Sequence, residues 1–468
     1  MKMRRPFLAA TGLCLCSFTV VSSVAFTGVD HQRIPAFARK YRTSCTTCHT
    51  APPKLNVLGE AFRLNGYKFP ENDALLRRDE PVALGSAEWK DIWPRAIWPG
   101  ELPGNVPIAL RIVNDVNLTR QSDAESSSSL RFPEEVYVLA GTTLGDNLSA
   151  FLESEWTRED GLEVLQAKVE LQNIIPGLPD RSLNVWVGVQ NLYLFTFADR
   201  QIDRAGRQNF LWQEYRVSDL TLRGPLAGDS LRSTNTFQLR RPQPALEVNG
   251  LLAGRLYYGI GLSQGTASTR QDDNDRKDAY YKVRYKFGGL GLDGAYAAGA
   301  KPVLGGGGQL LDRTLIVEHF GYVGAQPAEG NVDDAHRSFG VSARGIVGPL
   351  DLGVGYVWGS NDNPWGTVLS GQVDFSSLFA RMEYMFFPWF IGSIKFDDLD
   401  VNTPTTVQRS GFTAGGMDRT RLIPGVILLL RQNVRASLEL ELFTRDAASS
   451  ELMQREPNNL WLRLDVSF

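Results

Sequence analysis

The sequence predicts an all-β transmembrane barrel of about 16 antiparallel strands, preceded by a small N-terminal α-helical domain. Three observations favour this fold. From residue 106 onward, apolar and polar side chains alternate in many segments, which is the period of a β-strand. After residue 26, no stretch offers the roughly 18 uninterrupted apolar residues of a membrane helix. The final residues alternate as well and end in Phe468.

Residues 1–25 are predicted to be an export signal. A basic start at residues 2–5 precedes an apolar run at residues 7–21, and small residues 23–25 resemble a cleavage site. An anchoring helix is the alternative, which the short apolar run disfavours. Cleavage at this site would leave Cys45 and Cys48 as the only thiols of the exported chain.

The net charge argues against a nucleic-acid partner. It is -3 for the whole chain and -6 without the three cations of the export signal, and no basic cluster stands out. Acidic residues at 272–275 and 333–334 are predicted to be solvated loop charges rather than a cation site. His319 and His336 are assigned no role.

The segment Cys45-Thr46-Thr47-Cys48-His49 has the C-x-x-C-H spacing of covalent haem attachment. Two thiols one helical turn apart reach the two vinyl groups on one porphyrin edge, and the adjacent imidazole binds the iron. Zinc would need a second ligand pair, and a thioredoxin-like dithiol would need a βαβ unit, neither of which surrounds this motif. The motif predicts one covalent haem c, bound by Cys45, Cys48 and His49.

The residues after the motif predict a helix that covers the haem. Pro53 suits a first helical position, and Asn65-Gly66 is a typical helix stop. Gly59 would allow the porphyrin or another backbone segment to approach closely. The predicted apolar wall consists of Leu55, Leu58 and Phe62.

The second axial ligand of the iron is less defined. Residues 26–105 contain no methionine, and His31 is the only other histidine there. We therefore predict His31 as the second metal ligand. A solvated His31 with Lys40, Lys54 or a methionine of the barrel as the ligand stays open.

Residues 87–104, rich in Trp and Pro, are predicted to be a stiff connector, and strands follow it. In the clearest strands one row is apolar and the other charged. These charged rows are Gln166, Lys168, Glu170 and Gln172, then Lys282, Arg284 and Lys286, then Arg435, Glu439 and Glu441. A soluble β-sandwich alternates in the same way, so alternation alone does not decide between the two folds.

The last strand favours the membrane barrel. Its apolar row, which ends in Phe468, resembles the insertion signal of bacterial outer-membrane proteins. Closure into a barrel lets every backbone N–H and C=O in the lipid find a partner. We expect between roughly fourteen and eighteen strands. An even number would place the first and last residues of the barrel on the same, periplasmic side of the membrane.

The chain resembles the fused monohaem cytochrome c–porin family of the outer membrane, found in iron-oxidising bacteria. The likeness rests on Ile34–Pro70, on the WPGELPG connector at Trp98–Gly104, and on a barrel that ends in Phe468. It implies three parts: a signal peptide at 1–25, a monohaem cytochrome c domain with its connector at 26–105, and an outer-membrane β-barrel at 106–468.

The resemblance also implies a function. The protein would accept electrons from extracellular Fe(II) and pass them through its haem to a periplasmic c-type cytochrome, as an Fe(II):cytochrome c oxidoreductase. A haem inside the barrel would shorten the crossing of an apolar band about 25 Å tall. Two other functions stay open: a haem-gated porin or solute channel, and an outward electron conduit to extracellular acceptors.

Overall fold

The computed structural model describes most of residues 36–468. Outside the described residues lie 1–35, 71–72, 81, 84–87, 93–100, 103, 105–106, 121–126, 146, 159–160, 196–209, 214, 220–221, 225–229, 236, 266–274, 296–311, 331, 370, 403–412, 415–416 and 446–457. The predicted export signal and His31 therefore fall outside the described residues. The predicted division at residue 105 stays a prediction.

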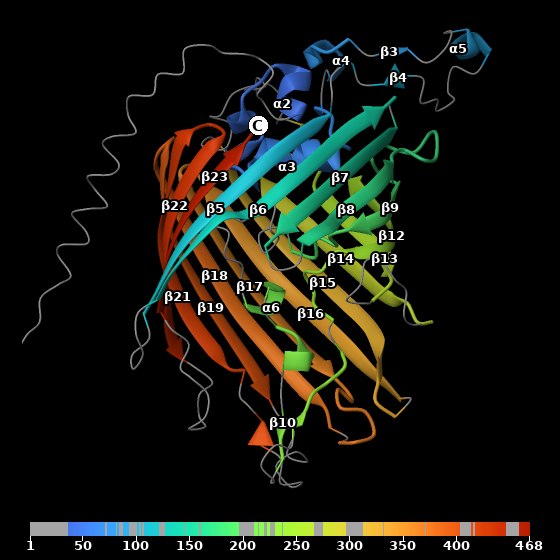
Figure 1. The fold of residues 1–468 in the computed structure, drawn as a ribbon. Coiled ribbons are helices and arrows are strands. Elements are labelled where there is room, and N and C mark those ends of the chain that lie inside the picture. The colour runs from blue at the N-terminus through green and yellow to red at the C-terminus, as the bar shows by residue number, and fades with distance from the viewer. Residues whose placement is uncertain are drawn as a thin grey trace, which may run out of the picture. The chain divides into compact units, whose positions relative to one another are not determined.

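Sixteen antiparallel strands close into a barrel, as the sequence predicts (Figure 1). Closure occurs where the last strand pairs with the first, from Asn458 opposite Arg120 to Ser467 opposite Arg111. In chain order the strands are β5 (Ile108–Arg120), β6 (Ser127–Leu144), β7 (Leu148–Thr157), β8 (Gly161–Leu171), β9 (Asn184–Gln190), β12 (Gln243–Leu252), β13 (Leu256–Ser263), β14 (Asp278–Gly288), β15 (Arg313–Ala328), β16 (Val332–Val347), β17 (Leu350–Asn361), β18 (Val373–Phe387), β19 (Phe390–Asn402), β21 (Arg419–Arg431), β22 (Val434–Arg445) and β23 (Asn458–Ser467).

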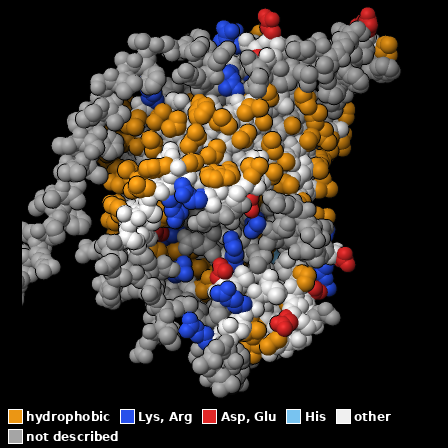
Figure 2. All heavy atoms as spheres, viewed as in Figure 1, with side chains coloured by type: hydrophobic (Ala, Val, Ile, Leu, Met, Phe, Trp, Pro, Cys, Tyr) orange, Lys and Arg blue, Asp and Glu red, His pale blue; other side chains and the backbone are white. Residues whose placement is uncertain are grey.

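The barrel is apolar outside and charged inside. In β14, Lys282 and Arg284 are 4% and 5% exposed. The alternating Val283 and Tyr285 are 39% and 40% exposed. Figure 2 shows the resulting band of apolar side chains across the visible face of the barrel. This arrangement excludes the soluble sandwich, whose charged row would face water, and fits strands surrounded by lipid. The other charged residues that the sequence places in these rows are buried too: Gln166, Lys168, Glu170, Gln172, Lys286, Arg435, Glu439 and Glu441.

The two ends of the barrel differ in their connections. At the end where β5 begins and β23 finishes, several turns are as short as residues 348–349, 388–389 and 432–433. The opposite end carries the longest connection, between β9 and β12, and its other connections are all longer than these turns, although residues 289–312 between β14 and β15 form a long connection at the first end. Since short turns face the periplasm in outer-membrane barrels, the end with Phe468 is the periplasmic one.

Short elements precede the barrel. They are α2 (Ala36–Tyr41), the 3-10 turn η2 (Cys45–Thr47), β1 (His49–Ala51), β2 (Lys54–Leu55), α3 (Val57–Leu64), α4 (Asp73–Leu76), β3 (Val82–Ala83), α5 (Trp89–Ile92) and β4 (Glu101–Leu102). We call residues 36–70 the N-terminal segment. Among the described residues, no helix is long and apolar enough to cross a membrane.

The helix after the C-x-x-C-H motif begins four residues later than the sequence predicts. Pro53 lies in the turn between β1 and β2, and α3 begins at Val57. Asn56 caps the helix, because its side chain accepts a hydrogen bond from the Gly59 N–H at 2.9 Å. The predicted stop is confirmed, with Asn65 as the C-cap and Gly66 at a φ of 63°.

The part of the chain that connects β9 to β12 forms a second segment inside the lumen. It contains α6 (Phe210–Gln213), η3 (Val217–Asp219), β10 (Leu222–Arg223) and β11 (Ser230–Leu231), and β10 also pairs with β20 (Thr413–Ala414). Figure 1 shows α6 within the barrel. Phe210 and Trp212 are buried there against inward side chains such as Phe320 and Phe379. We call this group of apolar side chains the lumen cluster.

Candidate functional site

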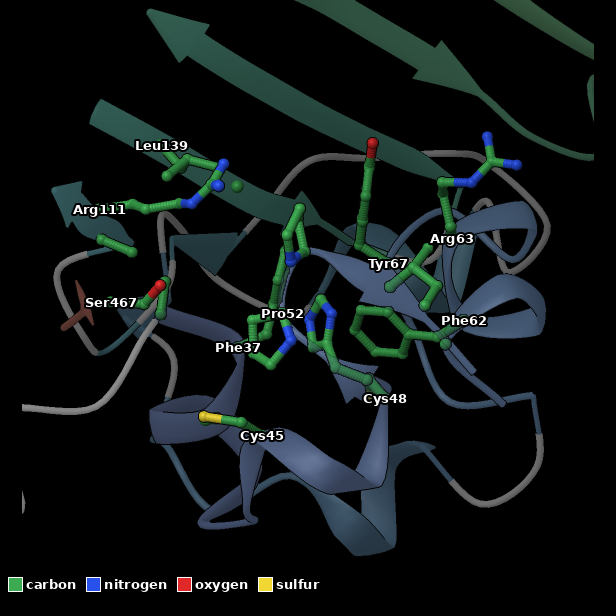
Figure 3. A pocket seen from close by; sticks show the side chains of 18 of the residues that line it. Phe37, Cys45, Cys48, Pro52, Phe62, Arg63, Tyr67, Arg111, Leu139 and Ser467 are labelled. Carbon is green, nitrogen blue, oxygen red and sulfur yellow. The ribbon is translucent and has the colours of Figure 1, made fainter. Parts of the chain in front are cut away.

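A cavity of about 230 Å³ lies between the N-terminal segment and the barrel wall (Figure 3). A single water needs roughly 10–15 Å³ of such space, so the cavity has room for a large organic group. Its barrel side comes from β5, β6, β7 and the end of β23, including Leu139, Phe151 and Ser467. It therefore lies at the periplasmic end of the barrel.

The structure brings Cys45, Cys48 and His49 to this one cavity. Cys45 begins η2, Cys48 follows that turn, and His49 opens β1. Both thiols are free. In Figure 3 the Cys45 and Cys48 side chains come from the N-terminal segment, whereas Arg111 and Leu139 come from the strands.

Burial sets the protonation of the three groups. It raises the pKa of the Cys45 thiol and raises that of Cys48 to about 12. It lowers the pKa of the His49 imidazole to about 4. At neutral pH the imidazole is therefore uncharged, which is the form that binds metals.

Asn56 joins the motif to α3. Its Nδ2 donates to the carbonyl oxygens of Thr46 and Thr47 at 3.1 and 3.0 Å, and its backbone N–H donates to that of Cys48 at 2.9 Å. A Cβ on Gly59 would lie 2.1 Å from the Cys48 oxygen. The close approach predicted at Gly59 is thus an approach of backbone to backbone.

Lys54 fixes the β1–β2 hairpin inside the barrel. Its side chain is fully buried, and its Nζ lies 2.5 Å from Asp351 Oδ2 of β17 and also contacts the Glu383 carboxylate of β18. In the same hairpin His49 pairs with Leu55. The hairpin that contains the predicted iron ligand is therefore tied to the barrel wall by two ion pairs.

The residues around the cavity fit a covalently attached haem. The Nδ1 of His49 is buried, with no hydrogen-bond partner in the described part of the chain. Phe37 and Tyr67 stack with ring centroids 5.4 Å apart and line the cavity with Phe62. Leu55 lines it as well, whereas Leu58 packs in the neighbouring apolar core rather than on the cavity.

The second axial ligand stays a prediction. Among the described residues that line the cavity, none is a methionine, a lysine or a second histidine. Lys54 is held by its carboxylates, and Lys40 donates to Thr143 Oγ1 at 2.9 Å. His31 lies outside the described residues. Within those residues no group of three or more His, Cys, Asp or Glu side chains could hold a metal ion.

Comparison with known protein families finds no family that matches this chain, and no curated protein matches it. Solved structures do resemble it. The outer membrane channel DcaP of Acinetobacter baumannii is 11% identical over 77% of this chain and 96% of that chain, with a TM-score of 0.50.

Two other solved barrels are less similar in shape. Salmonella typhi OmpF is 12% identical over 77% of this chain and 97% of that chain, with a TM-score of 0.48. An anion-selective porin from Comamonas acidovorans is 11% identical over 77% of this chain and 98% of that chain, with a TM-score of 0.47. At such identity the likeness to DcaP concerns the fold. Together with the apolar band, it makes this chain a porin-like barrel of 16 strands in the Gram-negative outer membrane.

Proposed function

We propose that this protein transfers electrons at the outer membrane through one haem c. The observation that carries the proposal is the convergence of Cys45, Cys48 and His49 on one apolar cavity inside the barrel. We further propose extracellular Fe(II) as the electron donor and a periplasmic c-type cytochrome as the acceptor, as the family resemblance implies. The protein would then act as an Fe(II):cytochrome c oxidoreductase.

The residues have distinct tasks in this proposal. Cys45 and Cys48 would hold the haem through two thioethers, and His49 would supply one axial ligand. Once bound, the haem supplies reversible one-electron chemistry, while the protein sets its position and surroundings. Phe37, Phe62 and the other aromatic side chains that line the cavity would exclude water from the haem. The ion pairs of Lys54 would hold the hairpin that contains His49 in place.

The position of the cavity suits a periplasmic acceptor, since it lies at the periplasmic end of the barrel. The outer part of the lumen holds the lumen cluster. Leu55 lines the cavity and also packs against that cluster, so packed protein continues from the cavity into the lumen. Electrons cross packed protein, whereas hydrated solutes do not.

A solute channel is the second candidate, and the fold favours it. DcaP of Acinetobacter baumannii, whose fold this barrel resembles, is described as an outer membrane channel. Under this alternative the N-terminal segment would gate the lumen. The lumen cluster argues against a permanently open pore, because its side chains occupy part of the lumen through which solutes would have to pass.

The decisive test uses intact cells of an iron-inactive host that exports the protein. We expect added Fe(II) to reduce the haem within seconds, as followed by its absorbance, with dithionite as the positive control. The Cys45→Ala, Cys48→Ala variant is the negative control. A haem that dithionite reduces and Fe(II) does not would refute the iron-oxidation proposal, and a large ion conductance of the wild type in planar bilayers would favour the channel.

A further inference from the structure

Arg111 is a charged side chain on the wall of an otherwise mostly apolar cavity. It lies on β5, it is 9% exposed, and Figure 3 shows it at the strand side of the cavity. Its Nε and Nη2 donate to the Asp465 carboxylate at 2.9–3.0 Å and 2.6 Å. No hydrogen bond from Nη1 is found among the described residues. This nitrogen is a donor available to a ligand.

Asp465 is shared between Arg111 and a second arginine. Arg435 Nη2 donates to the same Oδ2 atom at 2.9 Å. Arg435 is 2% exposed, and its Nε and Nη1 are buried with no hydrogen-bond partner in the described structure. Two guanidinium groups therefore share one carboxylate. A buried cation with unused donors is costly unless an anion completes its surroundings.

The other acidic groups near Arg111 have their own donors. Arg463 binds Asp115 at 2.6 and 2.8 Å and lies 3.9 Å from Glu135. Glu135 and Glu155 both contact the Tyr137 hydroxyl, at 2.8 and 2.5 Å. None of the hydrogen bonds described for these carboxylates comes from Nη1 of Arg111.

We propose that Arg111 binds a carboxylate of the group that fills the cavity, and that this carboxylate is a propionate of the haem. This inference rests on the proposed haem attachment. Guanidinium matches carboxylate geometry and forms strong charge-assisted hydrogen bonds. The porphyrin carries its propionates away from the thioether positions, and Arg111 enters from the strands while the thiols enter from the N-terminal segment.

Arg63 is the other cation among the described residues of the cavity wall, and it lies on α3, in the same N-terminal segment as the thiols. Its Nη2 donates to Glu60 at 3.1 Å, and its guanidinium lies 4.4 Å from the centre of the Tyr193 ring. The Arg111 guanidinium has a similar contact, 4.8 Å from the centre of the Tyr137 ring, but it lies on the strand side of the cavity, across from the segment that carries the thiols. We therefore assign the carboxylate to Arg111. A positive charge beside the propionate also favours the reduced haem, which carries one more negative charge.

The test measures the haem midpoint potential of the purified barrel. In Arg111→Gln we expect the potential to fall, with the reduction equilibrium constant about tenfold smaller, or ~59 mV for a one-electron couple. Arg111→Lys should keep most of the wild-type potential. The matched control is Arg421→Gln, a buried arginine paired with Asp397 and Glu441 away from the cavity. Heat-modified mobility on a gel verifies that each barrel is folded.

An unchanged potential in a folded, haem-bearing Arg111→Gln protein would overturn the inference and leave haem attachment intact. A wild type without covalent haem would instead refute the proposed function. A second arm separates the haem propionate from a free solute carboxylate. Succinate should not stabilise a haem-free Cys45→Ser, Cys48→Ser barrel against heat, and an Arg111-dependent stabilisation would assign the site to a solute.

Discussion

Removing the Lys54 ammonium should loosen the N-terminal segment from the barrel. Lys54→Met would leave the buried carboxylates of Asp351 and Glu383 without their shared cation. Removing one partner of a buried ion pair costs about 3–5 kcal/mol. Asp351 keeps Arg344 at 2.7 Å and Glu383 keeps Arg381 at 3.4 Å, so we expect the lower end, about 3 kcal/mol.

That free energy corresponds to a shift on the order of a hundredfold toward the released segment. Limited proteolysis should therefore cut residues 36–70 of the Lys54→Met protein far faster than those of the wild type. Ion conductance in planar bilayers should rise in parallel, because the segment would leave the periplasmic end of the lumen. Both measurements are made on the full chain in detergent or lipid.

Two further variants make this reasoning refutable. Arg337→Gln breaks an ion pair whose side chains are 52% and 36% exposed, and it should change stability by less than about 1 kcal/mol. Lys54→Met combined with Glu383→Gln should recover at most part of the protection, because it removes the Glu383 charge that Lys54 balanced but also takes that carboxylate from Arg381, 3.4 Å away. If Lys54→Met cleaves no faster than Arg337→Gln, the ion pairs do not hold the segment.

Three other perturbations test the site and the lumen. Gly59→Ala places a Cβ 2.1 Å from the Cys48 oxygen, so we expect much less covalent haem on denaturing gels. Its control is Gly345→Ala, whose added Cβ would have no atom within 4 Å and which should retain the haem. His31→Ala should abolish a low-spin bis-imidazole spectrum, and a sulfur-to-iron charge-transfer band in the wild type would exclude His31 as the ligand. Trp212→Ala removes a ring stacked 5.5 Å from that of Phe195 in the lumen and should raise conductance, and an unchanged conductance would mean that this stack does not restrict the pore.

The sequence predicts best those features that depend on neighbouring residues alone, such as the strands and the C-x-x-C-H motif. The alternation in β14 and in the strands like it follows from one face in lipid and one in the lumen, and the count of about 16 strands is confirmed. The C-x-x-C-H motif is likewise contained in five residues. The sequence predicts that this helix starts at Pro53, whereas α3 starts at Val57, because Pro at a first helical position is a weaker signal than the capping side chain of Asn56.

The rest of the site depends on contacts that sequence spacing does not reveal. Arg111 and Asp465 are 354 positions apart and meet because β23 closes the barrel against β5. Lys54 and Asp351 are 297 positions apart. The lumen cluster was missed for a related reason: the apolar residues between β9 and β12 look like those of a strand, and only the closed barrel makes a lumen for them to fill.

The charged interior distinguishes this barrel from a water-filled one. In an open pore the inward charges face water and attract solutes. Here several of them bind the chain itself, as Asp351 and Glu383 bind Lys54 and Arg284 lies 3.8 Å from Glu60 of α3. Each such contact exchanges water for a protein partner, and buried charges are stable there only when paired. A wall whose charges hold an internal segment is suited to fix that segment and the cavity it lines, which is what the proposed electron-transfer function would require of the barrel.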